Sequence, residues 1–325
     1  MTSGTWTLVN NLLANRRLHA TWGWQQNSIG VATGDDGSNH ISTAEEYNGT
    51  SWSSVNNVLT AVQAARGAGT ISAGLICGGR DTGGSNRDIT EEYDGTSWSS
   101  VNTLLTARRG HGSSGRSQST VLAWGGVGIN PPTLEEYDGT SWSNTGYNYP
   151  ELFMYGGTSG TSTDTISTGG GYYNTHAYTY DGSGWTRIAD LPVSHRNHMA
   201  AGESNSAIVA SGYFSNTTEE FNGTSWQSES NTNASQRDFT NQTGGTHDLA
   251  ILAGGNGALN TSEEWDDVPV CWNYTARYLN SNKLFKLSGC GPYPKHLRLP
   301  NNVDKSTGKL IDDGKLIDPD DYEVE

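Results

Sequence analysis

Short, largely apolar runs that end in glycine recur along the first 266 residues. Six such runs occupy residues 28–34, 73–79, 120–126, 164–170, 206–212 and 249–255. Runs of this length bounded by glycine are typical of buried β-strands. After each run come a polar loop of variable length, a segment ending in an aromatic residue, and a second segment holding a tryptophan. The pattern predicts an all-β protein built from short antiparallel strands, with the apolar runs as buried inner strands.

The polar positions between these runs repeat as well. Residues 45–52, Glu-Glu-Tyr-Asn-Gly-Thr-Ser-Trp, return almost unchanged at residues 91–98 and 135–142, and less closely at 180–185 and 219–226. The Asn-Gly and Asp-Gly pairs supply the positive φ that a tight hairpin needs. The tryptophans at 6, 52, 98, 142, 185 and 226 are spaced by 46, 46, 44, 43 and 41 residues. That period equals one four-stranded blade, so the chain is predicted to form a six-bladed β-propeller over residues 1–266.

The two ends of the repeat region complement one another. The last copy, residues 263–266, lacks the Gly-Thr-Ser-Trp that follows in the other copies, and residues 3–6 read Ser-Gly-Thr-Trp. We therefore expect the N-terminal strand to complete the last blade. Closure of this kind removes the unpaired strand edges that an open array would leave.

The repeat resembles the kelch repeat, which has a glycine doublet followed by an aromatic residue and a tryptophan at fixed distances. The wording Glu-Glu-Tyr-Asp-Gly-Thr-Ser-Trp resembles kelch-like proteins of marine tailed bacteriophages, usually assigned to tail fibres or other virion structures. The resemblance implies a non-enzymatic virion protein that presents its propeller to a host-surface glycan or protein, or to other virion proteins. The alternatives are a cellular kelch-like interaction module and a carbohydrate-active propeller enzyme.

Composition and charge argue for short strands and against some functions, such as binding nucleic acid or spanning a membrane. Only 33% of residues are apolar, whereas glycine (42) and tryptophan (11) are abundant, which fits short strands and tight turns. A net charge of −15 argues against binding nucleic acid through its phosphates. No apolar window is long enough to span a bilayer, and the N-terminus has no secretory signal pattern. We expect no membrane insertion, and synthesis in the host cytoplasm.

The charges change abruptly near residue 267. Residues 1–266 hold 25 acids, 11 arginines and no lysine, whereas residues 277–309 hold seven basic residues against one acid. Five prolines and the lack of a strand or heptad period predict an irregular C-terminal arm over residues 267–325. This arm is expected to bind virion proteins through the following anchors: Trp272, Tyr274, Tyr278, Lys283, Phe285 and Lys286. Whether Cys271 and Cys290 pair stays open.

The acidic doublets recur in five blades, whereas an active site is normally assembled once. We therefore predict a structural role and no catalytic residues. Five arginines recur before the inner strands, and the fourth blade lacks both the arginine and the doublet. One glutamate of each doublet is predicted to pair with an arginine, within or between blades. The arginines are Arg17, Arg66, Arg109, Arg196 and Arg237, and the glutamates are Glu45, Glu91, Glu135, Glu219 and Glu263.

Two further sets of residues carry possible chemistry. His19, His111 and His198 follow the arginines in alternate blades, but a six-bladed channel is too wide for all three to reach one ion at about 2.1 Å. We expect no metal and no cofactor. Six aromatic residues stand outside the repeating positions and are candidates for binding sugars or proteins; the alternative is that they fill irregular blades. They are Trp22, Trp24, Tyr147, Tyr149, Tyr172 and Tyr173.

Overall fold

The structure is a computed structural model that describes residues 4–171, 174–213, 215–233, 245–255 and 259–267, together with the backbone of five strands beyond residue 270. The chain divides into two compact units. One consists of Gly4–Asp266, and the other consists of Asp267–Glu325 together with Met1–Ser3. In the part of the chain that is described, all regular elements are strands. None of its elements is a helix long and apolar enough to cross a membrane.

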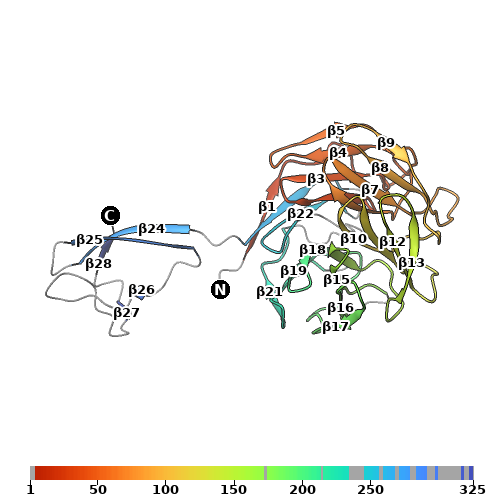
Figure 1. Ribbon diagram of the computed structural model, residues 1–325. Helices are drawn as coiled ribbons and strands as arrows, with labels where there is room; N and C mark the ends of the chain where they lie inside the picture. The colour runs from red at the N-terminus through yellow and green to blue at the C-terminus, as the bar shows by residue number, and fades with distance from the viewer. Residues whose placement is uncertain are drawn as a thin grey trace. The chain divides into compact units, whose positions relative to one another are not determined.

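The first unit is a β-propeller, with its sheets arranged in a ring (Figure 1). Five sheets have four strands each, ordered outwards along the chain as the sequence predicts. Blades 1 and 2 contain β2 (Ala20–Gln25), β3 (Ser28–Ala32), β4 (Ala44–Tyr47), β5 (Trp52–Val55), β6 (Arg66–Thr70), β7 (Ala73–Cys77), β8 (Thr90–Tyr93) and β9 (Trp98–Ser100). Blades 3 to 5 contain β10 (Gly112–Ser117), β11 (Thr120–Trp124), β12 (Thr133–Tyr137), β13 (Trp142–Asn148), β14 (Gly157–Thr161), β15 (Asp164–Thr168), β16 (Ala177–Tyr180), β17 (Trp185–Arg187), β18 (Met199–Glu203), β19 (Ser206–Ala210), β20 (Thr218–Phe221) and β21 (Trp226–Glu229).

The sixth blade joins the two ends of the propeller. Its described strands are β22 (Leu249–Ala253), β23 (Ser262–Asp266) and β1 (Thr5–Val9), and Gly245 forms a bridge to Ala250 on the inner side. The N-terminal strand β1 runs antiparallel to β23, with Trp6 opposite Trp265. The predicted closure by the N-terminal strand is therefore confirmed.

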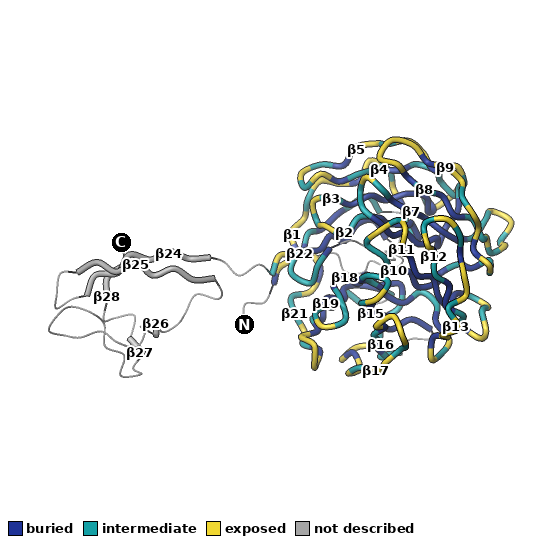
Figure 2. The backbone as a smooth tube through the Cα atoms, in the orientation of Figure 1, coloured by how far each residue is buried: buried dark blue, intermediate teal, exposed yellow. Residues whose placement is uncertain are grey.

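The core lies between neighbouring blades. The apolar runs form the second strand of each blade, and most of their residues are buried (Figure 2). The aromatic residue and the tryptophan of each hairpin stand opposite one another and pack as cross-strand pairs, with ring centroids 4.9 Å apart for Tyr93 and Trp98 and 5.0 Å apart for Phe221 and Trp226. Such pairs add stability beyond their buried area.

The antiparallel order gives the propeller two distinct faces. The loops between the second and third strands, and those leading to the next blade, lie on one face, which we call the loop face. The hairpins between the first and second strands and between the third and fourth lie on the other, the turn face. On the turn face the Asn48 and Asp94 side chains each accept two backbone N–H groups from their own turns, which fixes these short connections.

Near the loop face the blades are joined by a chain of backbone hydrogen bonds. The N–H of Ala64 donates to the carbonyl of Leu18 (2.7 Å). In the same way, the N–H of Gly110 donates to the carbonyl of Ala64, that of Tyr155 to Gly110, and that of Asn197 to Tyr155. These five residues all have φ between +51° and +57°. The left-handed backbone is unfavourable for side chains other than glycine. It is kept because it turns each N–H and carbonyl towards an adjacent blade.

The C-terminal unit contains more regular structure than the sequence predicted. β24 (Cys271–Tyr278) pairs antiparallel with β25 (Lys283–Cys290) along its full length, and β28 (Tyr322–Val324) pairs with β24. β26 (Leu297–Arg298) pairs with β27 (Leu316–Ile317). The aromatic and β-branched residues of β24 favour a strand, although its apolar and polar residues do not alternate strictly. The register sets Cys271 opposite Cys290; the side chains of this unit lie outside the described residues.

Candidate ligand site at the mouth of the central channel

A glycine with positive φ lies near the turn-face end of the inner segment of every blade. These glycines are Gly23, Gly69, Gly115, Gly160, Gly202 and Gly245. A Cβ on any of them would come within 2.0 to 2.6 Å of a backbone oxygen in the adjoining strand, so the tight turn requires glycine. The turn places no such requirement on the residue that follows each glycine. It is Trp24, Arg116 or Glu203 in blades 1, 3 and 5, and Thr70, Thr161 or Thr246 in blades 2, 4 and 6.

The three large residues of this ring meet across the channel. The guanidinium carbon of Arg116 lies 4.7 Å from the centroid of the Trp24 ring, and an Arg116 nitrogen lies 2.5 Å from a carboxylate oxygen of Glu203. The side chains of Arg116 and Glu203 are 25% and 32% exposed. A cation–π contact and a partly exposed ion pair each contribute up to about 1 kcal/mol. The cluster therefore links three blades that are not adjacent while remaining open to solvent.

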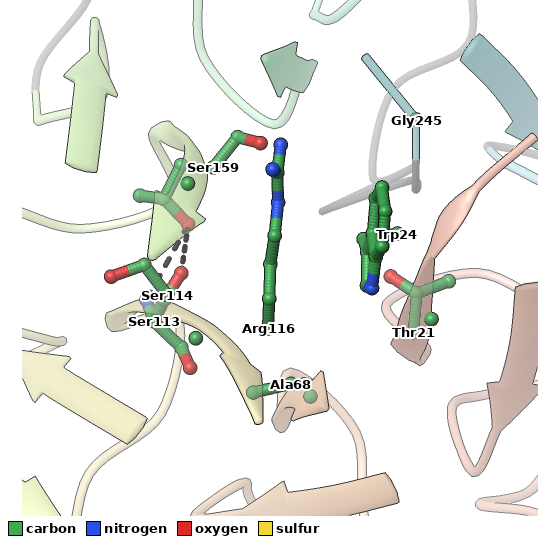
Figure 3. Close-up of a pocket in the computed structure, with 13 residues that line it drawn as sticks. Thr21, Trp24, Ala68, Ser113, Ser114, Arg116, Ser159 and Gly245 are labelled. Atoms are coloured by element: carbon green, nitrogen blue, oxygen red, sulfur yellow. Dashed lines mark hydrogen bonds between the residues drawn. The ribbon is translucent and has the colours of Figure 1, made fainter. Parts of the chain in front are cut away.

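A small cavity of about 50 Å³ adjoins this cluster. Trp24 and Arg116 line it together with Thr21, Ala68 and Ser159 and several of the turn glycines. Figure 3 shows the extended Arg116 side chain between Trp24 on one side and Ser159 on the other. The walls are small and mostly polar, and the space suits a few water molecules or one small substituent of a ligand.

The opposite end of the channel contains a buried arginine. Arg66, at the start of β6, is fully buried; its Nε donates to the carbonyl of His111 (2.6 Å), and a terminal nitrogen donates to the carbonyl of Gly156 (3.4 Å). Among the described residues no carboxylate lies within ion-pair distance of it. Burial lowers the pKa of Arg66 to about 10.

The three histidines predicted in alternate blades are core residues near this arginine. Burial first, and then Arg16 and Arg66, lower the pKa of His19 to about 3. Burial likewise holds the pKa of His111 and His198 well below the usual value for histidine, with Arg66 adding to both shifts. All three are therefore neutral at pH 7. Within the described ranges, no group of three or more His, Cys, Asp or Glu side chains is placed to hold a metal ion.

The first glutamate of each doublet is buried, but the predicted arginine partners are off by one residue. Glu45 pairs with Arg16 (2.5 Å) and Glu135 with Arg108, while Glu219 lies 2.6 Å from the ring of His195. Arg17, Arg109 and Arg196 are the next residues along the chain and turn to the loop face. They contact Asp35 (3.0 Å), the carbonyl of Gly84 (2.9 Å) and the ring of Tyr155, in that order. Because successive side chains of an extended segment point in opposite directions, an error of one residue exchanges core for surface.

The first glutamates of blades 2 and 6 accept backbone N–H groups. Glu91 accepts the backbone N–H of Leu59 (2.8 Å), whereas Arg66 donates to the carbonyls of His111 and Gly156, so the prediction that Arg66 pairs with a doublet glutamate is wrong among the described residues. Counting back from the turn glycine, Arg66 matches Ala20 of blade 1 and Val62 matches Arg16. Glu263 accepts the N–H of Asn233 (2.7 Å). Arg237 lies outside the described residues.

Blade 4 replaces the ion pair by aromatic residues. Phe153 stands where Arg16 does in blade 1, Tyr178 stands where Glu45 does, and both belong to one buried apolar cluster. The simultaneous loss of both partners in this blade agrees with a pairing that is structural.

In blades 1 and 2 the second glutamate of the doublet contacts a tyrosine of the next blade. The hydroxyl of Tyr137 in blade 3 donates to Glu92 of blade 2 (2.9 Å). Burial, followed by the carboxylate of Glu46 in blade 1, raises the pKa of Tyr93 in blade 2 to about 12. Neither glutamate of the doublets is thus left as a free acid or base for catalysis in the blades where these contacts are seen.

The predicted ligand-binding aromatics separate into three groups. Trp22 and Tyr149 are 1% and 2% exposed and fill the core, so they are wrong as ligand contacts. Trp24 lies at the channel mouth, and Tyr147 is exposed on the outer strand β13, packed edge-on against Tyr180. Tyr172 and Tyr173 lie outside the described residues. Sequence reasoning missed Arg116 and Glu203, although their shared position after the turn glycine was a usable signal.

No protein-family model matches the chain, and no curated protein is similar to it. The structure itself defines the class of the first unit as a six-bladed β-propeller, a fold that suggests a protein-interaction module.

Proposed function

We propose that the chain is a non-enzymatic structural protein of a bacteriophage particle, in a tail fibre, an appendage or the particle surface. Its propeller binds a host-surface glycan or protein, or a neighbouring virion protein. The kelch-like wording of the repeat supports the phage assignment. Residues 267–325, with their basic stretch, are proposed to attach the propeller to other virion proteins.

One observation supports binding over catalysis. The doublet glutamates Glu45, Glu135 and Glu92 are engaged in an ion pair or a hydrogen bond within the propeller, and the channel histidines are fully buried, away from any substrate in solution. The partly exposed cluster of Trp24, Arg116 and Glu203 instead replaces the threonines found at the same position in the other blades. Residues that vary at an exposed, rigidly held position are typical of recognition.

The proposal is tested by asking where the protein resides and what it contacts. Purified phage particles are analysed by mass spectrometry and labelled with an antibody against the chain, and the full-length protein is assayed for binding to host cells. We expect the chain in the particles and binding to cells or to purified virion proteins. Its absence from particles, with binding to a cytosolic cellular protein instead, would show the cellular interaction module.

A further inference from the structure

We propose that the channel mouth binds a neutral terminal sugar residue, with Trp24 as the stacking surface and the Arg116–Glu203 pair as the polar contact. This inference rests on the proposed function, because it gives the chemical class of the surface ligand that the propeller recognises.

The first argument is the aromatic surface. Trp24 is partly exposed beside the cavity, and its ring is held in place by the guanidinium of Arg116 at 4.7 Å. The guanidinium covers part of one ring face, and the part of the indole that stays exposed offers apolar area for the C–H face of a pyranose at little cost in side-chain entropy.

The second argument is the pairing of donors and acceptors without net charge. Arg116 and Glu203 lie 2.5 Å apart and neutralise one another, while each keeps hydrogen-bonding positions towards solvent. Thr70, Thr161 and Thr246 place hydroxyl groups at the equivalent positions of the ring. Sugar hydroxyls both donate and accept, so they match such a mixed set.

The third argument is the charge of the turn face. In the described residues the turn-face hairpins contain Asp94, Asp138, Asp181 and Asp248 and no lysine or arginine; the first three lie in outer hairpins and Asp248 lies in the inner hairpin of blade 6. Backbone N–H groups lower the pKa of Asp94 and Asp138, and hydrogen bonds from Ser183, its hydroxyl first, lower the pKa of Asp181. An acidic face disfavours sulfated, phosphorylated and uronic acid sugars and so favours neutral ones.

The fourth argument is size. A cavity of about 50 Å³ is far smaller than the roughly 300 Å³ or more of a site that encloses a whole ligand. It accepts one substituent, such as a hydroxymethyl group, while the ring itself stays at the mouth. This geometry favours the exposed end of a glycan over an internal residue.

The experiment uses the full-length chain and two kinds of probe. Saturation-transfer NMR is recorded with methyl glycosides of glucose, galactose, mannose and N-acetylglucosamine at about 10 mM, a concentration that fills even a millimolar site. A glycan array then compares neutral with anionic termini. We expect binding of at least one neutral terminus, and a loss of roughly tenfold or more in Trp24→Ala and in Arg116→Gln.

Matched variants make the result decisive. Tyr147→Ala removes an exposed aromatic residue on β13, away from the channel mouth, and is expected to bind normally. Thermal unfolding of each variant shows that it is folded. No transfer to any neutral glycoside, binding of anionic termini only, or equal binding by Trp24→Ala overturns the inference. If Trp24→Ala still abolishes binding to cells or virion proteins while no neutral sugar binds, the proposed function stands and the sugar assignment falls.

Discussion

The interior of the blades and the turn-face mouth of the channel use the same repeat in opposite ways. Within the blades, charged groups are buried and each first glutamate has a partner of its own, as in Arg16 with Glu45 and Arg108 with Glu135. At the channel mouth, Trp24, Arg116 and Glu203 are partly exposed and differ from blade to blade. A buried charge demands a partner and so fixes the residue type, whereas an exposed position after a required glycine is free to diverge.

The loop face and the turn face also differ in charge. The loop-face loops hold most of the described arginines and also three leucines, Leu13, Leu59 and Leu105, that are 59% to 61% exposed. On the turn face the described hairpins are acidic, and Arg116 at the mouth is neutralised by Glu203. We therefore expect changes near the loop face to alter stability and changes at the turn-face mouth to alter recognition, and four measurements test this division.

The largest expected effect is acid destabilisation through the buried histidines. The pKa in the folded state lies below the unfolded value of about 6.5, near 3 for His19, so below pH 6.5 the unfolded chain binds protons that the folded chain cannot. Stability is complete above that pH and falls as the pH drops towards 3. Each histidine contributes up to about 1.4 kcal/mol per pH unit. Urea unfolding from pH 8 to 4.5 measures this.

A variant separates the histidines from the carboxylates, which also titrate in acid. His19→Asn is expected to lower stability at pH 7 but to flatten the pH dependence between 6.5 and 4.5. A slope equal to that of the unmodified chain would mean that His19 is not a source of the effect.

The next effect comes from breaking one buried ion pair. Glu135→Ala leaves Arg108 buried and unpaired, and we expect a loss of about 3–5 kcal/mol in the free energy of unfolding. The double variant Arg108→Phe with Glu135→Tyr installs the combination that blade 4 carries at Phe153 and Tyr178, and should regain part of that loss. A cost below about 1 kcal/mol for Glu135→Ala would contradict a structural role for the pair.

A smaller effect is expected between blades 2 and 3. Tyr137→Phe removes the hydroxyl that donates to Glu92 and should cost about 1 kcal/mol, the net value of one hydrogen bond. Tyr147→Phe, which changes an exposed hydroxyl, serves as the control and should be neutral. Equal unfolding midpoints for the two variants would show that the contact with Glu92 adds nothing.

The smallest effect on stability belongs to the channel mouth. Trp24→Ala removes a partly exposed ring and one cation–π contact, and should cost less than about 1 kcal/mol. A loss as large as that of Glu135→Ala would make the cluster a structural support and would break the contrast between the interior of the blades and the channel mouth.

The sequence was most informative where the repeat sets local geometry. Tryptophan spacing, Asn-Gly turns and the incomplete last copy led to the blades and to closure by β1, because turn chemistry and strand length act over a few residues. The sequence was less reliable in predicting which side chains point into the core. The spacing predicts Arg17 and Arg109 as core partners, whereas Arg16 and Arg108 form the ion pairs, because spacing measured from the tryptophans does not reveal which side of an extended segment faces inwards.

The candidate site depended on tertiary structure for the same reason. Trp22 and Trp24 have similar surroundings in the sequence, yet the turn at Gly23 sends Trp22 into the core and leaves Trp24 at the channel mouth. Arg116 and Glu203 stand 87 positions apart in the sequence, so only the closed ring brings them within 2.5 Å. By itself the sequence determined the all-β class, the number of blades and their closure, which follow from local and periodic signals. The tertiary structure decided which charges pair and which residues meet across the channel, because those contacts depend on where distant strands come together.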